Sequence, residues 1–209
     1  MGVIDKKQIL ERVDLSQVVK LELGCGDAKR NVDAIGIDAL DFSCVDIVGD
    51  VYAVLSMFPD KSVDAVYSYH FVEHVADVPR LLSELARVLK PAATVEFVAP
   101  HFSNPYFYSD PTHRSFFGLY TFCYYARSSL FSRKVPTYDH DIKFDVISVD
   151  LIFKSSRPFY VRYVVKRLFG LIFNSCYYFR ELYEENFCYL VPCYEVKYLL
   201  RRHEDSSVI

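Results

Sequence analysis

Short apolar runs separated by polar stretches recur along this chain, which is the pattern of buried strands in an α/β protein. The first half contains such runs at residues 18–23, 34–38, 45–51, 62–69 and 94–99. Before the last of them, residues 77–90 place apolar side chains at helical spacing, with Pro79 in the first turn and Pro91 expected to stop the helix. This alternation of strands and helices predicts an α/β domain with additions.

The second half adds two strands and two insertions. We expect the strands at residues 141–153 and 193–200, which makes seven in all. One insertion, residues 101–136, is far richer in aromatic side chains than the rest of the chain. With 209 residues and 52% apolar content the chain can bury one good core, so residues 1–209 are predicted to form a single domain.

A glycine turn follows the first predicted strand. Gly24 and Gly26 allow positive φ, so the backbone can approach a ligand closely. A nicotinamide dinucleotide loop needs Gly or Ala at the third fingerprint position, which here is Lys29. Carboxylates end the next two strands: Asp38 can accept both hydroxyl protons of a ribose, and Asp50 follows at the third strand.

These motifs, in this order, resemble those of class I S-adenosylmethionine-dependent methyltransferases of the type 11 group. Glu22 and Ala28 match the residues that flank the glycines of that family, and residues 70–75 resemble its His-x-x-Glu-His-Val segment. The resemblance covers residues 18–100, the cofactor-binding half. It implies a Rossmann-like, seven-stranded class I methyltransferase sheet with helices on both faces. It also implies S-adenosylmethionine as the cofactor, bound by Glu22, Gly24, Cys25, Gly26, Asp38, Ala39, Asp50, Val51 and Tyr69.

Residues 101–136 are expected to form an aromatic cap over the cofactor. Ligand pockets are mostly apolar walls with a few placed polar groups, and aromatic faces pack well on the C–H faces of sugars. The alternatives are a secondary core and a contact between two copies of the chain.

Histidines are the candidates for a general base, because an alcohol acceptor must lose a proton during methyl transfer. We favour His113 as the catalytic base, then His101, with His70 as a substrate contact. His74 is expected to pack against a helix. Tyr106, with Asp110 and Arg114, completes the predicted substrate-binding residues.

Asp110 has two interpretations. With Pro111 after it, Asp110 resembles the N-cap of a helix that would contain His113. Alternatively, Asp110 orients His113, or joins His101 and His113 as ligands of a divalent metal that acidifies a sugar hydroxyl. We favour a base that works without a metal.

The acceptor is suggested by a second, less specific resemblance. Pro100-His101 and the segment at residues 108–117 are similar to a stretch of small methyltransferases associated with bacterial surface-polysaccharide biosynthesis. This implies O-methylation of a sugar hydroxyl in a nucleotide-activated or lipid-carried glycan. The alternatives are a lipid or small aromatic acceptor, and a non-catalytic partner subunit that keeps the fold.

Charge and cysteine content restrict the classes of partner and the cellular compartment that we expect for this protein. The 24 basic and 27 acidic residues give a net charge of −3, which argues against a nucleic-acid binder. Six cysteines without a Cys-x-x-Cys pair favour a reducing cytoplasm, and residues 1–17 lack the apolar core of a signal peptide.

The second insertion, residues 157–190, carries a wide apolar stripe beside Arg162, Lys166 and Arg167. It is too interrupted by charge to span a bilayer. It could lie peripherally on the inner membrane face or pack on the protein, including in a homodimer. The polar tail, residues 201–209, is expected to be frayed.

Overall fold

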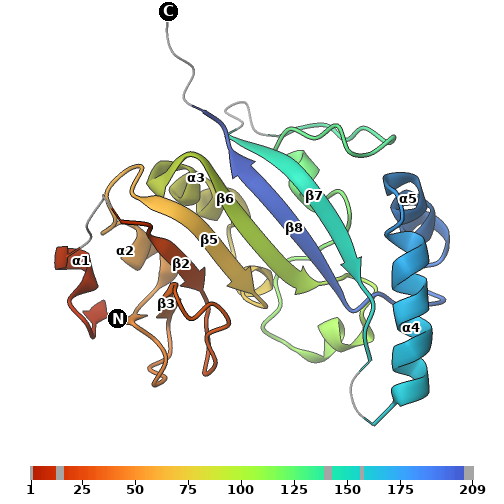
Figure 1. Cartoon of the computed structure of the whole chain (residues 1–209), viewed down its shortest axis with the longest axis horizontal. Helices are drawn as coiled ribbons and strands as arrows, with labels where there is room; N and C mark the ends of the chain where they lie inside the picture. The colour runs from red at the N-terminus through yellow and green to blue at the C-terminus, as the bar shows by residue number, and fades with distance from the viewer. Residues whose placement is uncertain (1, 13–16, 139–142, 156–157, 205–209) are drawn as a thin grey trace, which may run out of the picture.

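The computed structural model describes residues 2–12, 17–138, 143–155 and 158–204. One sheet runs through both halves of the chain, in the strand order β1-β4-β3-β2-β5-β6-β8-β7 (Figure 1). Its strands are β1 (Ile4–Asp5), β2 (Lys20–Leu23), β3 (Ile35–Asp38), β4 (Ile47–Val48), β5 (Val63–Tyr69), β6 (Leu89–Pro100), β7 (Phe144–Ile152) and β8 (Glu195–Arg202). The helices are α1 (Ile9–Arg12), α2 (Val51–Leu55), α3 (Val78–Val88), α4 (Tyr160–Phe173) and α5 (Tyr177–Asn186), with 3-10 turns η1 (Val72–His74), η2 (Pro105–Ser109) and η3 (Thr121–Tyr124).

The strands β4, β3, β2, β5 and β6 are parallel, and β8 runs antiparallel between β6 and β7. Strands β2 to β8 fall at the seven predicted positions, so the α/β fold class is confirmed. Parallel strands end at the same edge of the sheet, which brings the loops after β2, β3, β4 and β5 together. The small edge strand β1 was not predicted.

One face of the sheet holds the core. Val66, Val95 and Leu200 lie side by side on this face and are fully buried. Helices α2 and α3 pack here, and α3 begins where the Asp77 side chain accepts a hydrogen bond from the Arg80 N–H. The predicted helix over residues 77–90 is therefore confirmed, although it ends at Val88.

The opposite face, toward the viewer in Figure 1, differs from the expectation of helices on both faces. Tyr67, Glu96 and Leu199 are neighbours on this face and are only half-buried. Over these strands, no helix of the described ranges covers the sheet (Figure 1). Alternation of buried apolar and half-buried polar residues is typical of a sheet with one face in water.

Two boundary predictions are wrong. Pro91 lies inside β6 at an irregularity in the pairing with β5, so it does not stop the helix. Arg201 and Arg202 continue β8 because they pair with β7, and Arg202 is buried. Residues 205–209 of the predicted tail lie outside the described residues, as does the start of the strand predicted from residue 141.

The aromatic segment, residues 101–136, is mainly core. Phe117 and Phe122 are fully buried, and the Phe122 ring stacks on Phe97 of β6 at 4.9 Å between centroids. Tyr106 and Tyr108 remain largely exposed. The alternative of a secondary core thus describes the second part of this segment, and only its first part reaches the ligand edge of the sheet.

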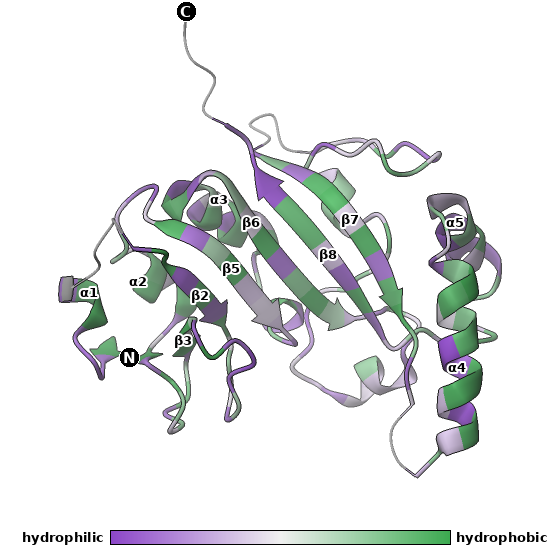
Figure 2. Cartoon of the chain, viewed as in Figure 1, coloured by the Kyte–Doolittle hydropathy of each residue, from purple (hydrophilic) through white to green (hydrophobic). Residues whose placement is uncertain are grey.

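The second insertion forms α4 and α5, which stand beside β7 at the end of the sheet (Figure 1). Of the residues of α4 only Phe173 is buried, and most of this helix is apolar (Figure 2). Among the described residues no helix combines the length and the apolar character needed to cross a bilayer.

Candidate active site

The turn after β2 requires glycine. Gly24 and Gly26 have φ of +64° and +59°, as the sequence predicts. A Cβ on Gly24 would lie only 2.4 Å from the Cβ of Phe71, which follows β5. The Gly24 N–H donates to the carbonyl oxygen of Ile37 at 2.8 Å. The turn is therefore held tightly between the ends of β3 and β5.

Backbone N–H groups surround the three predicted carboxylates. Glu22 is buried and accepts hydrogen bonds from the N–H groups of Arg30 and Asn31 at 2.8 and 2.6 Å. Asp38 accepts from Gly26 N–H at 2.8 Å, which fixes the glycine turn. Asp50 caps α2 by accepting from two N–H groups through Oδ1. Each carboxylate oxygen can accept more than one bond, so Asp38 and Asp50 keep capacity for a ligand.

A cavity of about 300 Å³ lies at this edge of the sheet. Five predicted cofactor residues line it: Gly24, Asp38, Ala39, Asp50 and Val51. Apart from the predicted substrate residue Arg114, the other residues that line it were not predicted to do so: Ile37, Gly49, Tyr52, Phe71, His74, Val75 and Ala76. These residues lie at the ends of β3, β4 and β5 or in the turns and the helix that follow these strands, so sheet topology was the signal that could have identified them.

The other four predicted cofactor residues do not line this cavity. Glu22 and Gly26 shape the loop, as described above. Cys25 is buried, and its burial raises the pKa of the thiol to about 12. The Tyr69 hydroxyl accepts from Asn31 and donates to Glu96. These residues support the turn from outside the cavity.

His70, the predicted substrate contact, lies between two carboxylates. Its φ is +54°, and its Nε2 lies 2.7 Å from Glu195 Oε1, while Nδ1 lies 3.4 Å from Glu73 Oε1. The hydrogen bond to Glu195, reinforced by Glu73, raises the pKa of His70 to about 9. His70 is therefore an imidazolium at neutral pH, which places a fixed positive charge after β5.

His101 does not fit a general base. The residue is fully buried, and its Nδ1 and Nε2 are hydrogen-bonded to Ser103 and Glu184 at 2.8 and 3.1 Å. With both nitrogens engaged, it can neither take a proton from an acceptor nor join Asp110 and His113 around a metal. This corrects both sequence-based roles of His101.

His113 lies at the ligand edge but not in a helix. Asp110 Oδ1 accepts from the Thr112 N–H at 2.8 Å, which makes a turn instead of the expected helix start. His113 Nδ1 lies 2.8 Å from the Phe107 carbonyl oxygen, and its Nε2 lies 3.7 Å from Asp110 Oδ2. Asp110 therefore lies beside His113, as its second interpretation requires.

His74, expected to pack against a helix, instead lines the cavity. Its ring lies 4.8 Å from that of His113, measured between centroids. Arg114, a predicted substrate residue, also lines the cavity, whereas Tyr106 is exposed and lies elsewhere.

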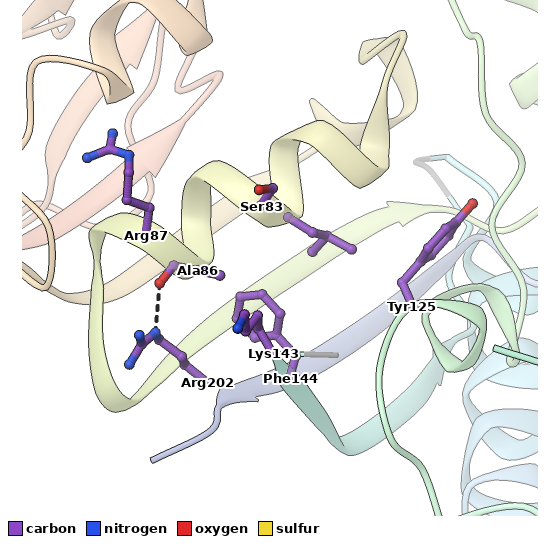
Figure 3. A pocket seen from close by; sticks show the side chains of 8 residues that line it. Ser83, Ala86, Arg87, Tyr125, Lys143, Phe144 and Arg202 are labelled. Atoms are coloured by element: carbon purple, nitrogen blue, oxygen red, sulfur yellow. Dashed lines mark hydrogen bonds between the residues drawn. The ribbon is translucent and has the colours of Figure 1, made fainter. Parts of the chain in front are cut away.

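Two other cavities lie away from these residues. One of about 380 Å³ is bordered by α3, Tyr125 and the ends of β7 and β8, where Arg202 donates to the Ala86 carbonyl oxygen (Figure 3). The other, about 710 Å³, is bordered by α5 and by Phe102 and Tyr120. Neither contains a residue of the glycine turn or a strand-end carboxylate, so the 300 Å³ cavity is the candidate cofactor site.

Residues 16–97 match a family model described as a methyltransferase domain. No curated protein matches the chain. The matched range contains the glycine turn, Asp38, Asp50 and residues 70–75, which are the motifs that carry the sequence resemblance.

Solved structures share the fold. A SAM-dependent methyltransferase from Archaeoglobus fulgidus is 19% identical, with a TM-score of 0.56 over 94% of this chain and 93% of that one. Phosphoethanolamine N-methyltransferase 2 of Haemonchus contortus, in complex with phosphomonomethylethanolamine and S-adenosylhomocysteine, is 16% identical, with a TM-score of 0.53. That match covers 94% of this chain but only 52% of the Haemonchus contortus protein. The chain has the class I S-adenosylmethionine-dependent methyltransferase fold.

Proposed function

We propose that this chain is an S-adenosylmethionine-dependent O-methyltransferase that methylates a sugar hydroxyl in a polysaccharide or glycan precursor. The observation that carries the proposal is the 300 Å³ cavity, which joins the predicted cofactor residues Gly24, Asp38 and Asp50 to His74 and Arg114. The family match and the fold support S-adenosylmethionine as the cofactor. A non-catalytic partner subunit would have no need for this cavity with its glycine turn.

Methyl transfer is a direct displacement at the sulfonium methyl carbon, so the protein must align the acceptor oxygen and remove its proton. His113 is the proposed base. Its Nδ1–H donates to the Phe107 carbonyl oxygen, so the neutral ring carries its lone pair on Nε2. The Asp110 carboxylate, 3.7 Å from this nitrogen, stabilises the imidazolium that forms.

The surroundings of His113 support a sugar acceptor. The His113 ring packs on Phe107, which contacts Tyr108 and Phe116 at 5.4 and 4.9 Å between centroids. Tyr108 and Phe116 are exposed by 64% and 59%. Exposed rings beside a base offer flat apolar surfaces to the C–H faces of a sugar. A closed apolar pocket would instead favour the alternative acceptors, a lipid or a small aromatic metabolite.

We also propose a cytoplasmic location for the protein and a surface on α4 through which it contacts a partner. Helix α4 exposes Val161, Val164, Leu168 and Leu171, and it carries basic but no acidic residues. Apolar and basic side chains together suit an anionic membrane surface. We therefore propose peripheral contact with the inner membrane face, where a lipid-linked glycan would be met; a homodimer through α4 is the alternative.

A transfer assay with isotopically labelled methyl groups tests the function. The acceptor panel contains sugar nucleotides, defined oligosaccharides, lipid extracts and, because of the similar Haemonchus contortus structure, phosphoethanolamine. We expect label in a sugar, with the methyl group on an oxygen by product mass and linkage analysis. Labelled lipid or phosphoethanolamine would replace the proposed acceptor, and no transfer to any acceptor class despite cofactor binding would favour the partner-subunit alternative.

A further inference from the structure

Three potential metal ligands meet beside the cofactor cavity. Glu73 and His74 belong to η1, and His113 follows the turn at Asp110. One ligand atom of each lies within 4.8 Å of the others. Cofactor binding leaves Glu73 unexplained, since this glutamate does not line the cavity.

Hydrogen bonds give the two histidines the same tautomer. His113 Nδ1 faces a carbonyl oxygen, which can only accept, so Nδ1 carries the proton. His74 Nδ1 lies 2.9 Å from the Thr112 hydroxyl, whose own proton goes to Asp110 Oδ1 at 2.6 Å. This hydroxyl must therefore accept from His74 Nδ1–H. Both rings keep a lone pair on Nε2, and metal-binding histidines are typically oriented in this way by a carbonyl or a carboxylate.

Glu73 provides independent evidence for a cation. Its side chain is buried, yet neither carboxylate oxygen has a hydrogen-bond partner. Glu73 Oε1 lies 3.4 Å from His70 Nδ1, which is an ionic contact without hydrogen-bond geometry. The positive charge of His70 compensates part of the cost of burying this carboxylate, but both oxygens still lack hydrogen bonds, so their lone pairs can bind a second cation. The Glu73 carbonyl also accepts from Arg114 N–H at 2.7 Å, which holds the His113 segment against η1.

We propose that Glu73, His74 and His113 bind a divalent transition-metal cation, such as Zn²⁺ or Mn²⁺. Two imidazoles and one carboxylate suit these ions and leave coordination positions for a substrate oxygen. This proposal deepens the proposed function and rests on it for the catalytic role of the cation. When the cation is bound, His113 is a ligand and the cation replaces it in activating the acceptor.

The reaction at this site balances without another co-reactant. An acceptor hydroxyl bound to the cation becomes more acidic and gives its proton to the Asp110 carboxylate, which passes it to solvent. The oxygen then forms a bond to the sulfonium methyl carbon. The carbon–sulfur bond breaks with its electron pair going to sulfur, which yields S-adenosylhomocysteine and the methyl ether.

Metal binding can be measured without any acceptor. Purified protein is treated with EDTA, dialysed and titrated with Zn²⁺ or Mn²⁺ by calorimetry and with Co²⁺ by visible absorption. We expect micromolar binding of one ion per chain, and at least tenfold weaker binding in Glu73→Gln and in His113→Ala. His203→Ala, which changes a histidine at the far end of β8, is the matched control and should bind as the wild type does.

Thermal melts keep this test independent of folding defects. Excess cation should raise the melting temperature of the wild type and of His203→Ala but not of Glu73→Gln. The metal site would be overturned if the wild type bound no cation, or if Glu73→Gln and His113→Ala bound the cation as tightly as the wild type does.

Activity and cofactor binding separate this inference from the proposed function. EDTA should lower methyl transfer, which then depends on His113 as the base, Mn²⁺ or Zn²⁺ should restore it, and S-adenosylhomocysteine should bind in both states. Full activity in EDTA would overturn the catalytic role of the cation and leave the proposed function intact. Failure to bind S-adenosylhomocysteine would instead overturn the proposed function, whatever the metal titration shows.

Discussion

The rings of His74 and His113 lie 4.8 Å apart between centroids and are inclined by 59°. His74 precedes β6 in the chain and His113 follows it. His74 lines the cofactor cavity, and His113 packs on the aromatic rings around Phe107. This contact joins the predicted cofactor half to the aromatic segment. Methyl donor and acceptor would thus meet where these two parts of the chain touch.

Replacing Gly24 by alanine should destabilise the protein more than the same change at Gly26. Both residues have positive φ, which costs an alanine about 1–2 kcal/mol. Only at Gly24 would the new Cβ collide, 2.4 Å from Phe71, whereas Gly26 has open space. We expect a loss of about 3 kcal/mol for Gly24→Ala and about 1 kcal/mol for Gly26→Ala in urea unfolding. Equal losses would show that the Phe71 contact does not restrict the turn.

His113→Gln should reduce turnover about 10²- to 10⁴-fold, because the acceptor loses either its base or a ligand of the activating cation. Affinity for the cofactor should change little. His101→Gln should instead lower the free energy of unfolding by about 1–3 kcal/mol, since Ser103 and Glu184 lose a buried partner. Steady-state kinetics on the folded fraction separates the two effects. A comparable loss of turnover in folded His101→Gln would contradict the structural role of His101.

Asp46 should make the free energy of unfolding depend on pH in the acid range. Burial opposes its ionisation, but hydrogen bonds from Lys29, Lys7 and the Gly36 N–H outweigh burial and lower its pKa. A lowered folded-state pKa gives stability that is present above the unfolded pKa, near 4, and is lost as the pH falls through the folded value. The free energy of unfolding should therefore fall more steeply below about pH 4 in the wild type than in Asp46→Asn.

Unfolding curves at several pH values check this expectation. Asp60→Asn is the control, because Asp60 forms an exposed ion pair with Arg87 and such pairs contribute little. Parallel pH profiles for wild type and Asp46→Asn would contradict the role assigned to Asp46.

Local patterns predicted the seven principal strands, the glycine turn and the strand-end carboxylates well. In each case the physical requirement lies within a few neighbouring residues: an apolar run, a positive φ at Gly24, a carboxylate such as Asp38 after a strand. The fold class followed from their order along the chain.

The roles of the catalytic residues could not be predicted from local sequence patterns. No local pattern separates the roles of His101 and His113, because only the folded chain shows that Ser103 and Glu184 occupy both nitrogens of His101. Glu73 gained significance only when burial left its carboxylate without hydrogen bonds. Such facts depend on residues distant in sequence, so periodicity and spacing do not contain them.

Helix α4 should bring the protein to anionic vesicles. We expect co-sedimentation at low salt and release at high salt, because exposed charges are screened within a Debye length. Leu171→Glu should weaken binding, since Leu171 is 70% exposed on α4. Val32→Glu, at an apolar position outside α4 that is 84% exposed, should not weaken it. If the protein stays in the supernatant with or without vesicles, a homodimer through α4 becomes the favoured explanation of its exposed apolar residues. Sedimentation velocity would detect that dimer.

Calorimetric titration of the wild type with S-adenosylhomocysteine and, separately, with NAD tests the central claim most directly. We expect S-adenosylhomocysteine to bind with a micromolar Kd, about 8 kcal/mol, and NAD not to bind. Asp38→Ala should weaken the first interaction by about 1–3 kcal/mol, because Asp38 lines the cavity and fixes the glycine turn. Tight binding of NAD with no binding of S-adenosylhomocysteine would contradict the assignment of this cavity to a methyl donor.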